Sequence, residues 1–145
     1  MAGGGFLLAV LWFDLMFDVQ VAPYRHAEVP EPVVSSIATY YRRVTTEAGR
    51  MGRLVAAFML VTIAGIVGEI VRSDGAVAVR WSSLALALVP IGLAGSRTVP
   101  RAIRLGSRQD SVDAQAAAAR LIFVEHVFCF CSIGTLLLVQ LIWMG

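Results

Sequence analysis

The placement of arginine constrains this chain more than any other feature of its sequence. Ten of the twelve arginines fall in two short stretches, Arg25 to Arg53 and Arg97 to Arg120, and four apolar segments lie between and around these stretches. If the four segments span a membrane, both arginine-rich stretches emerge on the same face. Only Arg72 and Arg80 emerge on the other face. Because short cytoplasmic loops carry the positive excess, the pattern predicts that both stretches are cytoplasmic and both termini non-cytoplasmic.

Composition supports an integral membrane protein. Hydrophobic residues make up 58% of the chain, whereas soluble domains are typically about half apolar. The chain has no lysine, and membrane topology explains its arginines without a nucleic-acid partner. With 145 residues, the chain is expected to form one domain, residues 1–145. The first residues lack the basic region of a signal peptide, so we expect the first apolar segment to be retained.

The predicted fold is an all-α, four-helix transmembrane bundle in contact with the lipid bilayer. The spans are expected at about residues 5–22, 52–71, 79–97 and 121–143. Each approaches the roughly 20 residues that cross a bilayer core. Trp81 and Trp143 fall at the predicted outer surface, and all three tyrosines fall near the inner one, which is typical of interfacial aromatic residues.

Helical cytoplasmic extensions are expected on spans two, three and four. Pro32 suits the first turn of a helix, and helical spacing follows at Ile37, Tyr40, Tyr41 and Val44. Gly106 and Ser107 are expected to end the extension of span three. Asp110 is expected to cap the helix that leads into span four.

Four ionisable side chains lie within the apolar spans, where charge is costly and usually functional. Asp14 and Asp18 are one helical turn apart in the first span, and Glu125 and His126 lie early in the fourth. At about 1.5 Å per residue, Asp18 lies roughly 6 Å deep and Asp14 roughly 12 Å deep. Glu125 and His126 lie about 6 to 8 Å deep by the same measure. The sequence therefore predicts that the four side chains meet in the cytoplasmic half of the bundle.

One face of the last helix is predicted to be a polar stripe. At about 100° per residue, a sector of roughly 120° contains Glu125, His126, Cys129, Ser132 and Gln140, together with the apolar residues Ile122, Ile133 and Leu136. Cys131 points to the far side. The two cysteines therefore cannot converge on one metal while the helix is regular, and each is expected to act as a small hydrophobic residue.

Three interpretations of the Asp14, Asp18, Glu125 and His126 set remain open. It can be a polar tie between the first and last spans. It can be a proton relay, or a general base that faces a lipophilic substrate. It can also bind a divalent first-row metal, because imidazole and carboxylates suit zinc, manganese or iron. The Glu-x-x-His signature of di-iron bundles is absent.

Two further patterns favour structural roles. Gly65 and Gly68 have the spacing of residues at close helix contacts in membranes. Glu69 precedes Arg72 by one turn, which predicts a local surface ion pair.

Three sequence strings carry a family resemblance. These are Phe13 to Pro23, the run Arg97-Thr98-Val99-Pro100, and Glu125-His126-Val127. In layout over most of the chain, the sequence resembles the anthrone-oxygenase-like family of small four-helix membrane proteins. The resemblance implies that fold and the oxidation of a flat aromatic or lipophilic substrate. His126 is the only functional position of the family that it assigns in this chain. The chain departs from the family pattern at Glu125, where a neutral residue is usual, and in its two first-span acids.

The sequence thus predicts a small membrane protein whose buried Asp/Glu/His site binds or oxidises a lipophilic molecule. The alternative is a non-catalytic accessory subunit that packs against other membrane subunits or against further copies of itself. A transporter ranks third, because four spans without inverted repeats offer little room for a translocation path.

Overall fold

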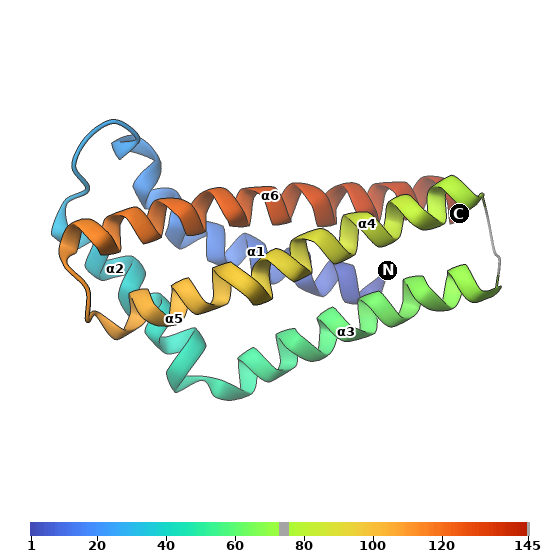
Figure 1. Ribbon diagram of the computed structural model, residues 1–145, viewed down its shortest axis with the longest axis horizontal. Helices are drawn as coiled ribbons and strands as arrows, with labels where there is room; N and C mark the ends of the chain where they lie inside the picture. Colours follow the sequence, from blue (N-terminus) through green and yellow to red (C-terminus); the bar gives the residue numbers. More distant parts are fainter. Residues whose placement is uncertain (73–75, 145) are drawn as a thin grey trace.

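The computed structural model describes residues 1–72 and 76–144, and within these residues it is helical with no strand. The chain runs through α1 (Ala2–Asp18), the 3-10 helix η1 (Val19–Tyr24), α2 (Glu31–Tyr41), the π-helix η2 (Arg42–Glu47) and α3 (Gly49–Arg72). It continues through α4 (Val77–Leu93), the π-helix η3 (Ala94–Thr98), α5 (Val99–Ser107) and α6 (Val112–Met144). Long helices lie along the bundle, and α2 lies at the end opposite the C terminus (Figure 1).

In the part of the chain that the structure describes, four helices are long and apolar enough to cross a membrane, which confirms the predicted all-α four-helix bundle. They cover Ala2–Tyr24, Gly49–Arg72, Val77–Ser107 and Val112–Trp143. Each extends beyond the predicted span at one or both ends. Large apolar side chains such as Leu60, Val89 and Ile142 lie exposed on the outside of the bundle, as the surface of an integral membrane protein requires.

The predicted helical extensions are present. α5 continues α4 through η3, and the last span begins at Val112, well before its apolar part. The extension of the second span is α2, which starts at Glu31 with Pro32 in its first turn. It is not continuous with α3, because η2 and a turn at Ala48 (φ −99°, ψ 50°) separate the two helices.

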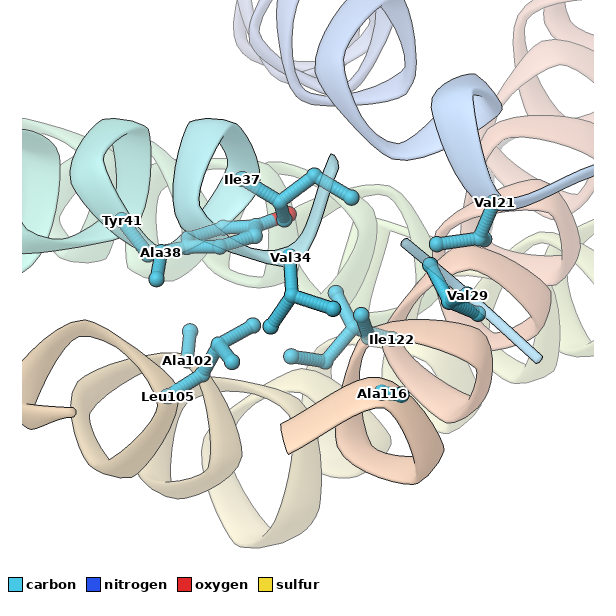
Figure 2. Close-up of a cluster of buried hydrophobic side chains, with 11 residues drawn as sticks. Val21, Val29, Val34, Ile37, Ala38, Tyr41, Ala102, Leu105, Ala116 and Ile122 are labelled. Carbon is cyan, nitrogen blue, oxygen red and sulfur yellow. The ribbon is translucent and has the colours of Figure 1, made fainter. Parts of the chain in front are cut away.

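A first cluster of buried side chains fills the arginine-rich end of the bundle. Val34 of α2, Leu105 of α5 and Ile122 of α6 converge there (Figure 2). We call this group the α2 cluster; its buried members are Val21, Val29, Val34, Ile37, Ala38, Tyr41, Ala102, Leu105, Ala116, Ala119 and Ile122. Arginines also hold this end together. Arg108 pairs with Glu31, and Arg120 donates hydrogen bonds to the carbonyls of Tyr24 and Ala27.

A second cluster lies within the spans. We call it the span cluster; its buried members are Leu7, Ile66, Ala87, Ile133 and Leu136. Ile66 is the one buried residue of α3, so α3 is attached to the bundle mainly by partly buried side chains. Asp14 and Asp18 on α1, and Glu125 and His126 on α6, lie along their helices between the two clusters.

Three expectations about local packing were wrong. A Cβ added at Gly65 or Gly68 would meet nothing within 4 Å, so these glycines make no close helix contact. No ion pair forms between Glu69 and Arg72, both of which lie in the described part of the chain. Asp110 was expected to cap α6, but the Ser111 hydroxyl caps it by accepting a hydrogen bond from the Ala114 amide at 3.3 Å.

Asp110 does not cap α6 because its carboxylate instead accepts two hydrogen bonds from Arg104, at 2.7 and 2.8 Å. The Arg104 guanidinium lowers the pKa of the Asp110 carboxyl, since it stabilises the charged form. As predicted, the extension of span three ends at Ser107. Arg108 follows in the left-handed conformation (φ 56°).

Candidate functional site

The centre of the candidate site is a histidine–carboxylate pair between the first and last spans. The Nδ1 atom of His126 lies 2.7 Å from Oδ2 of Asp18. Its other ring nitrogen, Nε2, lies 3.9 Å from Oδ2 of Asp14. Asp18 is 0% exposed and His126 is 7% exposed. Three of the four predicted site residues are therefore together, with the imidazole between two carboxylates.

Two tyrosines of α2 complete the group. The Tyr41 hydroxyl donates to Oδ1 of Asp18 at 2.7 Å and lies 3.3 Å from His126 Nδ1. The Tyr40 hydroxyl donates to Oδ1 of Asp14 at 2.7 Å. The Tyr40 ring stacks on Phe17, with centroids 4.0 Å apart and an interplanar angle of 9°. Each carboxylate of α1 thus receives one phenol hydrogen bond.

Both phenols keep their protons. Burial raises the pKa of Tyr40, and the adjacent Asp14 carboxylate raises it further. Burial likewise raises the pKa of Tyr41, with Asp18 as the second cause. A phenolate in either position would be desolvated and next to a carboxylate. Tyr40 and Tyr41 therefore act as hydrogen-bond donors to the two carboxylates.

Sequence reasoning did not include the two tyrosines in the site, because it took them for aromatic residues at the membrane surface. The signal available was their position on the apolar face of the α2 helix. That spacing shows which face is buried, but it does not show that α2 packs against α1 and α6. The missing information was tertiary.

Glu125 does not join the other three ionisable residues. Its carboxylate forms an ion pair with Arg101 and accepts a hydrogen bond from the Thr98 hydroxyl at 2.8 Å. One residue along a helix turns the side-chain direction by about 100°, so Glu125 faces the η3 and α5 side while His126 faces α1. The prediction that Glu125 converges with Asp14, Asp18 and His126 was wrong in this respect.

The rest of the polar stripe on α6 is confirmed. Cys129, Ser132 and Gln140 are buried with His126, and Cys131 is exposed. The Cys129 thiol faces the carbonyl of Pro90 at 3.7 Å.

Two cavities meet at His126 and Asp14. The first, with about 550 Å³ of empty space, extends from the site along the spans. The second, of about 850 Å³, extends toward η2 and the start of α3. They share Val10, Asp14, Val55, Thr98, Val99 and His126. Most of the remaining lining is apolar, with Leu7, Leu11, Met59 and Ile133 in the first cavity and Phe13, Val44 and Met51 in the second.

Asp14, Asp18 and His126 are the residues that could supply metal ligands here, since they are the grouped carboxylates and imidazole. Within residues 1–72 and 76–144, no group of three or more His, Cys, Asp or Glu side chains has an arrangement that could hold a metal ion. Metal binding stays a prediction.

Comparisons with protein-family models, curated proteins and solved structures gave no match. The resemblance to the anthrone-oxygenase-like family therefore also stays a prediction.

Proposed function

We propose that this protein binds a lipophilic small molecule in the joined cavities and that His126 accepts a proton from it. The observation that carries the proposal is the position of His126. Its Nδ1 side is paired with the fully buried Asp18, while the residue lines both apolar cavities. A histidine with only a structural role would need its partner Asp18, but it would not need to line a cavity.

The cavities favour a lipophilic ligand. Small-molecule sites are typically concave spaces with apolar walls and a few converging polar groups. Both cavities have mainly apolar walls, and the polar groups that they share lie at their junction. The polar groups at their junction are Asp14, Thr98 and His126. A ligand with an apolar body and one acidic hydrogen-bond donor fits this lining.

The pairing favours proton transfer from the ligand to His126. A histidine that donates Nδ1–H to a carboxylate presents the lone pair of Nε2 as a base, and the carboxylate stabilises the imidazolium that forms. Asp18 has the position of that carboxylate, and Tyr41 holds it in place from α2. The resulting imidazolium would lie between Asp14 and Asp18, whose negative charges would stabilise it.

The resemblance to the anthrone-oxygenase-like family extends the proposal to oxidation. A flat aromatic ligand with an acidic C–H or O–H group would lose its proton to Nε2 of His126. The electron-rich anion that remains can transfer electrons to dioxygen, a small apolar oxidant. In that reaction the ligand is oxidised, dioxygen is reduced, and His126 holds the proton.

The cavity can be tested with 2-naphthol, a flat aromatic alcohol whose fluorescence distinguishes the neutral and ionised forms. Val55 lines both cavities, so Val55→Phe should fill their junction without changing a polar group. We expect this variant to weaken naphthol binding by about tenfold or more, which corresponds to about 1.4 kcal/mol. The matched control is Leu54→Phe on the exposed face of the same helix, which should bind as the unmodified protein does.

The role of His126 is tested in the same assay. His126→Gln should abolish naphtholate emission from the bound probe, while Cys131→Ala should leave it intact. Equal binding in the Val55→Phe and Leu54→Phe variants would contradict a ligand site in the cavities. Absence of binding by the unmodified protein to any lipophilic alcohol would favour the accessory-subunit alternative instead.

A further inference from the structure

Tyr40 separates the buried site from a groove on the outside of α2. The groove has about 880 Å³ of empty space, and its polar lining is Glu31, Ser35, Ser36, Thr39 and Arg43. Tyr40 lines this groove and also lines the inner cavity that contains Asp14 and His126. It is therefore the residue shared by a polar external surface and the apolar internal site.

We propose that Tyr40 is the proton-conducting residue that connects the His126 site to this groove. The inference rests on the proposed function, in which His126 gains a proton that has to leave. Two contacts connect Tyr40, Asp14 and His126 in series. The Tyr40 hydroxyl donates to Oδ1 of Asp14 at 2.7 Å, and Oδ2 of Asp14 lies 3.9 Å from Nε2 of His126. A bridging water or a small side-chain rotation closes the longer step.

Each transfer conserves protons and charge. The imidazolium gives its Nε2 proton to Oδ2 of Asp14, which becomes a carboxylic acid while His126 becomes neutral. Rotation of that carboxyl group presents its proton to the Tyr40 oxygen, and the phenol releases its own proton to water in the groove. The phenol is never left ionised, because it gains one O–H bond as it loses the other. Glu31 and Arg43 are the charged groups of the groove.

The other end of the site is closed to this path. Asp18 is fully buried, and its partner Tyr41 belongs to the α2 cluster and lines the inner cavity. A proton on Asp18 therefore has no comparable contact with the groove. The geometry assigns Asp18 and Tyr41 to holding His126, and Asp14 and Tyr40 to moving its proton.

The chain offers a probe that needs no ligand, because it has two histidines. The full-length protein with His26→Gln, labelled with ¹⁵N-histidine and placed in lipid nanodiscs, gives the ring signal of His126 alone. At a pH low enough to form the imidazolium, Nε2 also carries a proton, and water-saturation transfer then measures the rate at which this Nε2 proton exchanges with water. Tyr40→Phe keeps the ring that stacks on Phe17 and removes the relay oxygen. We expect it to slow exchange about tenfold or more, within the range of single acid–base groups.

Asp14→Asn should slow exchange as well, because an amide cannot carry the proton, and it serves if Tyr40→Phe fails to fold. Tyr24→Phe is the matched control, since Tyr24 lies outside the series of bonds, and it should leave the rate unchanged. Unchanged or faster exchange in Tyr40→Phe would overturn the relay and show that Tyr40 only lines the cavity and the groove. Slowed exchange in a protein that binds no naphthol would keep the relay and reject the proposed function.

Discussion

A fully buried carboxylate holds the only histidine within the spans. Asp18 has two partners, Nδ1 of His126 and the Tyr41 hydroxyl, each at 2.7 Å. These two contacts therefore connect Asp18 to two other helices, α2 and α6. The pair joins the first and last spans at the boundary between the two clusters. Such a buried charge depends on its partners, because it has no access to water.

Removal of either member should therefore be costly. Asp18→Ala and His126→Ala should each lower the free energy of unfolding by about 3 to 5 kcal/mol, the usual cost of breaking a buried pair. The double variant should lose much less than the sum of the two, because neither residue is then left buried without its hydrogen-bond partner. Loss of helicity during titration with sodium dodecyl sulfate measures these differences. Glu69→Ala is the control and should change little, because Glu69 forms no ion pair with any residue that the structure describes. Additive losses would show that the pair is not energetically coupled.

At the scale of elements, periodicity and angular arithmetic predicted what a single helix determines. The four spans, the helical extensions and the buried stripe of Cys129, Ser132 and Gln140 on α6 are all properties of one segment. What the sequence could not show is which helices approach each other. Glu125 turned to Arg101 because α5 packs on that side of α6, and the tyrosines entered the site because α2 folds against α1. A close helix contact was predicted at Gly65 and Gly68 of α3, but such contacts occur at other glycines.

One such contact joins α5 to the end of α2. A Cβ at Gly106 would lie 2.7 Å from the backbone nitrogen of Arg42 and 2.9 Å from its Cα. Because backbone atoms cannot yield as a flexible side chain can, Gly106→Ala should lower the free energy of unfolding by about 1 to 3 kcal/mol. Gly92→Ala is the matched control in open space, and it should be neutral or stabilise by up to about 1 kcal/mol. Sodium dodecyl sulfate titration compares the two variants. Equal stability would show that α5 can move away without cost.

At the scale of the whole molecule, the bundle is polarised. The arginines of residues 25–53 and 97–120 belong to the segments at the end that contains the α2 cluster, while Arg72 and Arg80 lie toward the other end. This distribution follows from the sequence alone, and the four helices long enough to span a membrane agree with it. The side of the membrane that each end occupies stays a prediction from the arginine excess.

Sidedness can be measured with single cysteines in a protein that carries Cys129→Ala and Cys131→Ala. Ala76→Cys lies between the second and third spans, and Gln109→Cys lies between α5 and α6; both positions are exposed. In intact cells, a membrane-impermeant maleimide should label Ala76→Cys and leave Gln109→Cys unlabelled until the cells are opened. The reverse pattern would place the arginine-rich end outside and would invert every assignment of depth made from the sequence.

The length of α6 has a consequence for how the molecule responds to its solvent. Its 33 residues extend about 50 Å, whereas a bilayer's hydrocarbon core is about 30 Å thick. We expect the surplus to begin at the arginine-rich end, which would place the α2 cluster outside the hydrocarbon core as an apolar core surrounded by water. Burial from water stabilises it, and this contribution weakens in urea and on cooling. The span cluster lies in lipid, where close packing between helices holds it together instead. Tyr41 belongs to the α2 cluster and donates a hydrogen bond to Asp18 on the first span. A solute that acts only through water, such as urea, would therefore loosen the α2 side of the site. The packing between the spans would stay assembled.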